Sequence, residues 1–249
     1  AEFESTFLSY LEEAGWSYLA GSSLPCDSMR DVLYTDDMEF FLNRTNPDLT
    51  ADEIQQIMDT VRLAGAESDF ATLHKVYDWM VNGIQFTPQA ALPRMVNLID
   101  FEDPEKNVFR AVNQSTVEYT NNGQTQTRRP DILLFGNGMT LCIIELKNPA
   151  DKNATIYDAW EQINIRYWRD IPHLLHYCPL ACISDGVKTR LGTVRTPYEH
   201  FYAWRRVNDG DKVSPLPFDE VQTMIKGVYS PKRFLEIFRD YIYFRTASM

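Results

Sequence analysis

The fold is decided by the stretch Arg129-Pro130-Asp131-Ile132-Leu133-Leu134-Phe135-Gly136-Asn137-Gly138-Met139-Thr140-Leu141-Cys142-Ile143-Ile144-Glu145-Leu146-Lys147. Its two apolar runs predict short strands joined by a tight turn at Gly136-Asn137-Gly138. Asp131 stands at the start of the first strand, and Glu145 and Lys147 lie two positions apart near the end of the second. Flanks this uniformly apolar are typical of central strands buried on both faces, where unpaired charges are costly. The charged residues therefore need a functional reason.

The directions of these side chains depend on the turn. Side chains alternate along a strand, so Glu145 and Lys147 share one face. An odd-length loop would place Asp131 on that face as well, either opposite Glu145 or two positions away from it. An even-length loop would put the two carboxylates on opposite faces, because a one-residue slip reverses every side chain. We expect an odd loop or a compensating β-bulge.

Two carboxylates on one face form a site of hard oxygen ligands that suits Mg²⁺. A metal there can lower the pKa of a bound water and balance charge on a phosphorane-like transition state. Lys147 would add a positive charge beside the attacking water or the phosphate. This Pro-Asp…Glu-x-Lys layout is typical of metal-dependent nucleases. The spacing alone is common by chance, so an ordinary hairpin with an exposed acid and an edge Glu–Lys pair stays open.

Length and composition indicate a globular chain. It has 249 residues, 44% hydrophobic and 13% aromatic, which suits one large domain or a domain with a helical appendage. Its apolar runs are far too short to span a membrane, and no signal peptide opens the sequence. Cys26, Cys142, Cys178 and Cys182 are scattered, so we expect a reduced, cytoplasmic protein.

The net charge of −11 argues against a general nucleic-acid binder, because such proteins usually carry a basic balance. Affinity for DNA would have to come from a local basic strip or from partner domains. The candidate strip residues are Arg128, Arg129, Lys147, Lys152, Arg166, Arg169, Lys188, Arg190 and Arg195. Taken singly, each of them is more often a solvated surface charge.

The first third of the chain is predicted to be helical. Apolar residues at helical spacing predict an amphipathic helix over residues 2–14, which Gly15 ends. Residues 28–82 are predicted to be helical throughout, with a capping box at Thr50-Ala51-Asp52-Glu53. A helical insertion over 28–83 would interrupt an otherwise compact α/β unit.

The rest of the chain alternates between strands and helices. The predicted elements are strands over 94–100, 107–119 and 179–184, strand character up to Trp204, a hairpin turn at Asn121-Asn122-Gly123, and helices over 154–169 and 217–245. The last helix begins at Ser230-Pro231, a capping residue followed by proline. This order predicts a single α/β domain over 1–249, with its core at 94–204.

Three features outside the hairpin could carry chemistry. Glu4 lies on the first helix, where a first-turn glutamate also simply favours the helix dipole. Gln162 and Tyr167 lie on an aromatic-rich helix, and aromatic residues either stack on bases or, more commonly, pack against a sheet. His173-Leu174-Leu175-His176 with Cys178 is a weak indication of a metal site, because structural zinc needs four ligands.

Taken together, these residues resemble the N-terminal nuclease domain of the R (motor and restriction) subunit of type I restriction enzymes, within the PD-(D/E)XK nuclease superfamily. The resemblance rests on Glu2-Phe3-Glu4 to Gly15-Trp16, Asn107-Val108-Phe109, Val112-Asn113-Gln114, Arg129-Pro130-Asp131, Ile144-Glu145-Leu146-Lys147-Asn148-Pro149, Ile183-Ser184-Asp185-Gly186 and Phe201-Tyr202-Ala203-Trp204. It covers nearly the whole chain. It implies a restriction-endonuclease-like α/β fold, a mixed β-sheet flanked by helices, with an inserted helical block near the N-terminus.

The resemblance also implies site residues. Asp131, Glu145 and Lys147 would carry Mg²⁺-dependent cleavage of double-stranded DNA, with Mn²⁺ able to substitute. Asp131 and Glu145 would bind the metal, with Glu4 as a further acid. Gln162 and Tyr167 would fill a glutamine–tyrosine motif, although four residues separate them here rather than the usual three. On a regular helix that places them about 140° apart around the axis, so a joint contact needs a bulge or a helix end.

The resemblance implies partners as well. Such subunits continue into an ATP-driven DNA translocase, but this sequence contains no Walker-type phosphate loop. We therefore expect an excised fragment, or a subunit cut short, whose helices over 217–245 lead to an absent motor domain; ATP would bind only the full-length subunit. Expected partners are double-stranded DNA, the motor domain, and the specificity and methylation subunits, with no membrane. Two alternatives stay open: a nuclease-fold binding or assembly module that is catalytically silent without partners, and a repair nuclease or resolvase of the same fold.

Overall fold

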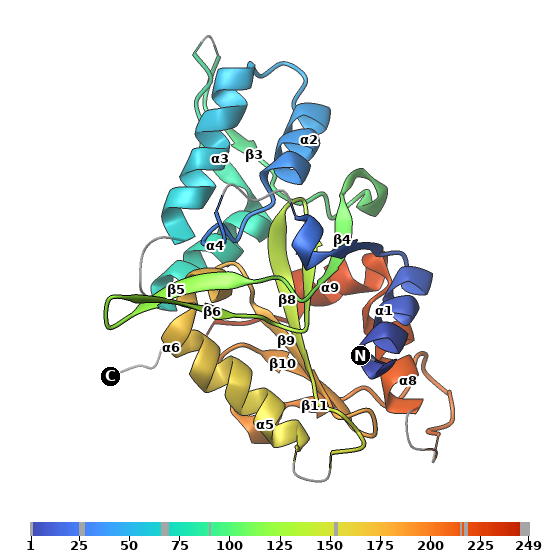
Figure 1. Cartoon of the computed structure of the whole chain (residues 1–249). Helices are drawn as coiled ribbons and strands as arrows, with labels where there is room; N and C mark the ends of the chain where they lie inside the picture. The colour runs from blue at the N-terminus through green and yellow to red at the C-terminus, as the bar shows by residue number, and fades with distance from the viewer. Residues whose placement is uncertain are drawn as a thin grey trace, which may run out of the picture.

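The computed structural model describes residues 2–24, 28–65, 70–89, 91–151, 154–214, 216 and 219–244 (Figure 1). Its first helix is α1 (Glu2–Ala14), as the apolar spacing predicted. The helix ends at Gly15, whose φ of 115° is a backbone conformation that residues with a Cβ rarely adopt. No helix in the described part of the chain is long and apolar enough to cross a membrane.

A seven-stranded sheet forms the centre of the molecule. In spatial order its strands are β1 (Ser17–Ala20), β4 (Phe109–Asn113), β7 (Ile132–Gly136), β8 (Met139–Leu146), β9 (Leu180–Ser184), β10 (Thr189–Thr193) and β11 (Tyr202–Ala203). The β1–β4 and β8–β9 pairs are parallel and the other pairs are antiparallel. The chain is therefore a mixed α/β protein of the restriction-endonuclease-like kind, as predicted. The short strand β1 lies outside the predicted core and was not expected.

Both faces of the sheet are covered, which explains the uniformly apolar flanks of the central hairpin. Every residue of β7, and every residue of β8 except Leu146, is buried. One face packs against α1, α8 (Asp219–Val228) and α9 (Pro231–Asp240). The other face packs against the helical segment that follows β8 and against Leu174 and Leu175. Alternate side chains of one strand therefore enter two different apolar clusters.

The predicted helical block is real but shorter than expected. It consists of α2 (Thr35–Thr45), α3 (Ala51–Gly65) and α4 (Phe70–Asn82), gathered at one end of the molecule in Figure 1. The prediction of helix throughout 28–82 was wrong for residues 46–50, which connect α2 to α3, and for residues 28–34. The backbone groups of residues 28–34 bond elsewhere: the Tyr34 amide donates to the Gly138 carbonyl at 2.8 Å, and the Met29 carbonyl accepts from the amide of Glu118 at 2.8 Å.

One local prediction about this block is confirmed, and one contact that joins it to the sheet was not predicted. The capping box at Thr50 is present, because the Glu53 carboxylate accepts from the Thr50 amide at 2.9 Å and the Glu53 amide donates back to the Thr50 hydroxyl at 3.3 Å. The block is joined to the sheet through an ion pair between Asp37 of α2 and Arg110 of β4, whose Nη2 donates to Asp37 Oδ1 at 2.7 Å. This ion pair and its hydrogen bond raise the pKa of Arg110.

The strand predictions before the hairpin need correction. Residues 94–100 were predicted as one strand, but β3 (Arg94–Val96) is short and pairs with β2 (Ile84–Phe86) outside the main sheet. The chain then forms a loop, because the Asn107 side chain accepts from the Asp100 amide at 2.8 Å and donates to the Asp100 carbonyl at 2.7 Å. These bonds satisfy backbone groups that a longer strand would need.

The predicted strand over 107–119 is also broken. It divides into β4 and β5 (Val117–Asn121), because Gln114 between them has a φ of 53°. β5 turns at Asn122-Gly123 into β6 (Gln124–Arg128), as the Asn-Asn-Gly sequence predicted, and forms an outlying hairpin. The chain returns from this hairpin directly to β7.

The C-terminal helices α8 and α9 agree with the prediction of helices over 217–245, as far as that range is described. Ser230 precedes Pro231 at the start of α9, but its side chain makes no capping hydrogen bond. The prediction of Ser230 as a capping residue is therefore right about position and wrong about chemistry. Proline suits the first helical position because the amide that it lacks would have no partner within the helix.

Candidate active site

The central hairpin brings the two predicted acids onto one face. The turn between β7 and β8 has two residues, Asn137 and Gly138, and the register shifts between Leu134 and Phe135. An even turn combined with a β-bulge is one of the two arrangements that the sequence predicted. Beyond the bulge Ile132 faces Ile144, so the next positions outward are Asp131 and Glu145. The two carboxylates therefore lie opposite one another on adjacent strands.

Glu145 is a buried acid, only 2% exposed. Its pKa is raised well above the usual glutamate value, first by burial and next by the negative charge of Asp131, while the Lys147 ammonium acts in the opposite direction. Gln162 Nε2 donates to Glu145 Oε1, and the Tyr167 hydroxyl donates to Glu145 Oε2 at 3.1 Å. These two hydrogen bonds hold the carboxylate in one orientation. The positive charge of Lys147 does not offset the effects of burial and of Asp131 on the pKa of Glu145.

Lys147 and Asp131 complete the arrangement. Lys147 Nζ donates to Gln162 Oε1 at 2.8 Å and lies 3.7 Å from Glu145 Oε1. Asp131 Oδ2 accepts from the Leu146 amide at 2.8 Å, which fixes this carboxylate to the end of β8. Gln162 therefore contacts the lysine with its oxygen and the glutamate with its nitrogen, and it sets the spacing between their charged groups.

The helix after the hairpin explains how Gln162 and Tyr167 meet. α5 (Ile156–Glu161) passes into a π-helical segment (Gln162–Tyr167) and then into α6 (Trp168–Asp170). In a π-helix residues five apart lie one turn above the other, and Gln162 Nε2 donates to the Tyr167 hydroxyl at 2.8 Å. The five-residue spacing that is too wide for a regular helix is accommodated by the bulge. Burial, and then the charge of Glu145, raise the pKa of Tyr167, which keeps the hydroxyl protonated as a donor.

Deleting one residue from this segment should preserve the site. A π-bulge is one extra residue in an α-helix, so removing the half-exposed Ile165 should restore a regular helix with Gln162 and Tyr167 still on one face. We expect the Mn²⁺ dissociation constant to change by no more than about threefold, or about 0.6 kcal/mol. Deleting the exposed Gln56 from α3 is the control; it should rotate the rest of that helix by about 100° and destabilise the fold. Isothermal titration and thermal melting measure both effects, and lost Mn²⁺ binding in a folded Ile165 deletion would contradict the bulge interpretation.

The sequence did not predict a role for Gln114. Its Nε2 donates to Glu4 Oε2 at 3.0 Å and to Asp131 Oδ1 at 3.3 Å, and its backbone amide donates to the Asp131 carbonyl at 2.9 Å. The φ of 53° places the side chain between the two acids. A glutamine directly after an apolar strand carries no local signal for this position, since the contacts come from α1 and β7.

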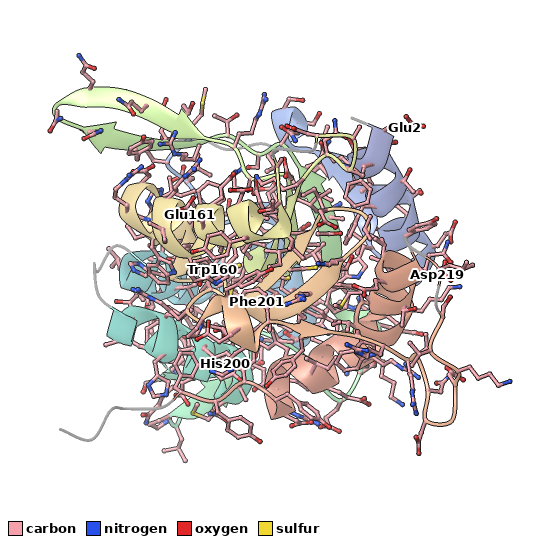
Figure 2. All side chains as sticks on the ribbon, turned by 90° about the horizontal axis from the view of Figure 1, so that it is seen from below. Glu2, Trp160, Glu161, His200, Phe201 and Asp219 are labelled. Atoms are coloured by element: carbon pink, nitrogen blue, oxygen red, sulfur yellow. The ribbon has the colours of Figure 1, made fainter. Side chains whose placement is uncertain are left out.

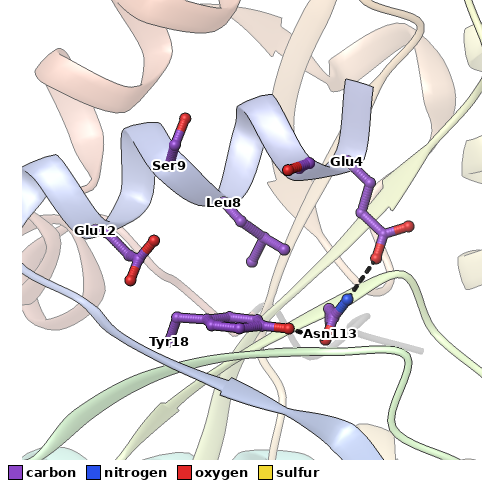
Figure 3. A pocket seen from close by; sticks show the side chains of 7 residues that line it. Glu4, Leu8, Ser9, Glu12, Tyr18 and Asn113 are labelled. Atoms are coloured by element: carbon purple, nitrogen blue, oxygen red, sulfur yellow. Dashed lines mark hydrogen bonds between the residues drawn. The ribbon is translucent and has the colours of Figure 1, made fainter. Parts of the chain in front are cut away.

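Glu4 therefore reaches the site indirectly. It lies on α1 and also accepts from Asn113 Nδ2 at 2.8 Å, and Asn113 accepts from the Tyr18 hydroxyl at 3.1 Å (Figure 3). These residues line a cleft of about 430 Å³ between α1 and the start of the sheet, together with Leu8 and other residues of α1. Two hydrogen bonds through Gln114 separate Glu4 from Asp131. Its part in metal binding stays a prediction.

Comparison with known proteins decides the family. The sequence matches the family described as type I restriction enzyme R protein N terminus over residues 2–200. This chain belongs to that family. It is 29% identical over 263 residues to the type I restriction enzyme HindI endonuclease subunit of Haemophilus influenzae, a match that covers all of this chain and 24% of that protein. It is 28% identical over 264 residues to a putative type I restriction enzyme MjaIXP endonuclease subunit of Methanocaldococcus jannaschii, covering 96% of this chain and 25% of that protein. The chain spans about a quarter of the length of these curated relatives.

In this type I R-subunit N-terminal region, the donor set fits Mg²⁺. Asp131 and Glu145 supply carboxylate oxygens, and a cation between them would relieve the repulsion that contributes to the raised pKa of Glu145. Mg²⁺ is commonly bound through one or two carboxylates while it keeps several waters. Among the described residues, no cluster of three or more His, Cys, Asp and Glu side chains is arranged to hold a metal ion. The pair therefore suits a cation that completes its shell with water and substrate oxygens.

The alternative zinc site at His173, His176 and Cys178 gains no support. His176 Nδ1 lies 2.9 Å from the Gly65 carbonyl, and Cys178 is fully buried with its Sγ directed at the Leu180 carbonyl. Burial and the neighbouring His176 lower the pKa of His173. These side chains take part in the packing of the helix-to-β9 connection and do not converge on one point.

The predicted basic strip is only partly present. Arg128 and Arg169 both pair with Asp170, and Arg166 pairs with Glu161. The Arg195 guanidinium lies 3.7 Å from the Trp168 ring centroid, and that indole donates to the Val194 carbonyl at 2.6 Å; the Trp160 indole likewise donates to the Thr196 carbonyl at 2.9 Å. The two tryptophans therefore pack against the β10 end, which is the more ordinary of the two predicted uses. Lys152 lies outside the described residues.

Proposed function

We propose that this chain is the Mg²⁺-dependent endonuclease part of a type I restriction R subunit, and that it hydrolyses phosphodiester bonds of double-stranded DNA. The observation that carries the proposal is the convergence of Asp131, Glu145 and Lys147 at one end of the central hairpin, with Gln162 bonded to both Glu145 and Lys147. The family membership and the names of the relatives support it. Mn²⁺ is expected to substitute for Mg²⁺.

The chemistry divides among these side chains. Asp131 and Glu145 would hold the metal, which when bound supplies charge neutralisation at the phosphate and a more acidic water. Lys147, fixed by Gln162, places a positive charge where negative charge develops on the phosphate. Tyr167 and Gln162 each donate one hydrogen bond to Glu145 and so keep its carboxylate directed towards Asp131 without reorganisation.

The acidic balance of the chain makes partner dependence part of the proposal. With a net charge of −11, this region would bind DNA weakly on its own. We propose that an ATP-driven translocase elsewhere in the full-length subunit delivers the duplex, and that the specificity and methylation subunits choose the site. We assign no role in reading the base sequence to the described side chains of the site.

The test is cleavage of supercoiled plasmid by this chain alone and by a complex that contains the full R subunit with its specificity and methylation subunits. We expect cleavage by the complex in Mg²⁺ or Mn²⁺, none in EDTA, and little by the chain alone. A complex that translocates but never cuts would favour a silent assembly module. Preferential cleavage of four-way junctions by the chain alone would favour a resolvase.

A further inference from the structure

The hairpin of β5 and β6 projects from the molecule. Within the described residues its strands pair only with each other, and Figures 1 and 2 show it extending away from the sheet beside the α5–α6 helical segment. Each strand has five residues, so the arm is about 17 Å long at about 3.4 Å per residue. Three residues after Arg128, the last residue of β6, the chain reaches Asp131. The base of the arm therefore lies at the candidate site.

The inner face of the arm is fixed to the body. Tyr119 is buried, its hydroxyl donates to Gln126 Oε1 at 2.7 Å, and the Arg128 guanidinium lies 5.1 Å from its ring centroid. Arg128 Nε also donates to Asp170 at 2.7 Å at the end of α6. These contacts join the arm to the helix that carries Tyr167, so its direction relative to the site is set.

The outer face is largely open, and among the described residues Arg30 is the side chain of the body that contacts it. Thr120, Thr125 and Thr127 are exposed and, because Thr120 pairs with Thr125 and Thr127 with Glu118, they share one side of the ribbon. We call Thr120, Thr125 and Thr127 the threonine face. Arg30 lies over its edge, donating to the Thr120 hydroxyl at 2.9 Å and lying 4.0 Å from Glu118. The face offers hydroxyl donors, and its one carboxylate, Glu118, lies beside the Arg30 guanidinium.

The charges around the arm differ from those of the chain as a whole. Residues 119–130 contain no Asp or Glu, although the chain carries 35 of them and a net charge of −11. At the base of the arm four arginines, at positions 30, 128, 129 and 169, accompany three carboxylates, Glu118, Asp170 and Asp131 of the candidate site. Arg129 is exposed, and no described side chain pairs with it. Residues 119–130, whose only charged side chains are Arg128 and Arg129, are therefore a basic segment of an acidic protein.

We propose that the threonine face lies along the sugar–phosphate backbone of duplex DNA that flanks the bond to be cut. Threonine hydroxyls and arginines are common donors to phosphate oxygens, and such contacts position a duplex without reading its sequence. A two-stranded ribbon also fits a DNA groove. The inference rests on the proposed function and adds to it the surface that holds the substrate beside Asp131 and Glu145. It also explains how a chain with a net negative charge can engage a polyanion locally.

The test places negative or positive charges on the threonine face and compares the effects of the two signs. Thr125→Glu with Thr127→Glu should weaken binding of this chain to a short duplex at least about tenfold at low salt, whereas Thr125→Lys with Thr127→Lys should tighten it. The lysine pair should also steepen the dependence of log K on log salt by up to about 1.8, since each added phosphate contact contributes about 0.9. Fluorescence anisotropy with Ca²⁺ in place of Mg²⁺ measures both quantities, and melting curves verify folding.

The controls make the same charge changes far from the arm. Gln56 and Thr60 are exposed on α3, and their Glu/Glu and Lys/Lys pairs should change binding no more than net charge alone requires. Equal effects of the arm and α3 pairs would overturn the inference, as would weakened binding by both signs on the arm. If the arm variants bind DNA normally but fail to assemble with the other subunits, the face docks a protein and the inference is wrong.

The same experiments separate this inference from the proposed function. If the arm variants do not change DNA binding and the complex still cuts DNA, the proposed nuclease function stands and the arm has no part in holding the substrate. Charge-dependent binding through the arm in a complex that never cuts would keep the DNA-binding surface and remove the nuclease activity.

Discussion

Alanine at Asp131 or at Glu145 should abolish DNA cleavage and weaken divalent-metal binding, whereas alanine at Lys147 should abolish most cleavage and leave metal binding intact. The two acids face each other across the β7–β8 pair and would both contribute ligand oxygens. Removing either acid leaves a single carboxylate. That carboxylate would hold Mg²⁺ weakly, because the remaining ligands of the ion would be water molecules.

Lys147 differs because its charge opposes the metal. Its Nζ lies 3.7 Å from Glu145 Oε1, so removing it lowers the local positive potential and should leave Mn²⁺ binding unchanged or slightly tighter. The loss of one preorganised charge at the reacting phosphate costs roughly 100- to 1,000-fold in rate, about 3–4 kcal/mol. Cleavage and translocation are separate steps in this proposal, so all three variants should still hydrolyse ATP in a complete complex.

The measurements are plasmid cleavage and ATP hydrolysis by the complete complex, with calorimetric titration of Mn²⁺ into this chain. Glu199→Ala and Lys232→Ala are matched controls, because both residues are exposed and lie outside the site. Near-normal cleavage by Lys147→Ala, or loss of metal binding in that variant alone, would show that the lysine is misassigned. Metal binding unaffected by Asp131→Ala and Glu145→Ala would remove the metal from this pair.

Gly138→Ala should unfold or severely destabilise the protein, whereas Gly123→Ala should be tolerated. Both glycines follow an asparagine in a two-residue hairpin turn, with φ values of 80° and 76°. At Gly123 an added Cβ meets nothing within 4 Å, so the cost is the left-handed backbone strain of about 1–2 kcal/mol. At Gly138 the same Cβ would lie 2.0 Å from the Tyr34 carbonyl oxygen.

The overlap at Gly138 cannot relax cheaply. The Tyr34 amide donates to the Gly138 carbonyl at 2.8 Å, and the neighbouring Asn137 is fully buried with its Nδ2 bonded to the Leu98 carbonyl at 2.9 Å and to Asn107 at 2.8 Å. Moving the turn would break buried hydrogen bonds, so we expect a loss of at least about 4 kcal/mol, which is exceptional for one substitution. Urea unfolding of the two variants side by side measures the difference. Equal losses would show that the turn at Gly138 moves freely.

The turns at Gly138 and Gly123 separate what a local sequence pattern predicts from what depends on distant residues. The Asn-Gly turns predicted both hairpins, because the left-handed backbone that such turns require is a property of the turn residues themselves. The prediction of either an odd loop or a β-bulge also followed from the sequence, since two acids on one face of a buried hairpin permit only a few registers. The pattern could not distinguish the buried turn at Gly138 from the exposed turn at Gly123, because that difference depends on Tyr34, more than a hundred residues away from Gly138 along the chain.

The sequence by itself therefore determined the α/β order of elements, the central hairpin and the shared face of Asp131 and Glu145, because these follow from residue periodicity and turn chemistry; that the two acids lie opposite one another was decided by the register of the folded hairpin. Only the tertiary structure decided that Gln114 bridges Glu4 and Asp131, that residues 28–34 are not helical, and that the β5–β6 arm projects from the molecule beside the site. The physical reason is that these features consist of hydrogen bonds and packing between segments far apart in the chain. Such contacts are selected by the folded arrangement as a whole, and no local pattern of residues encodes them.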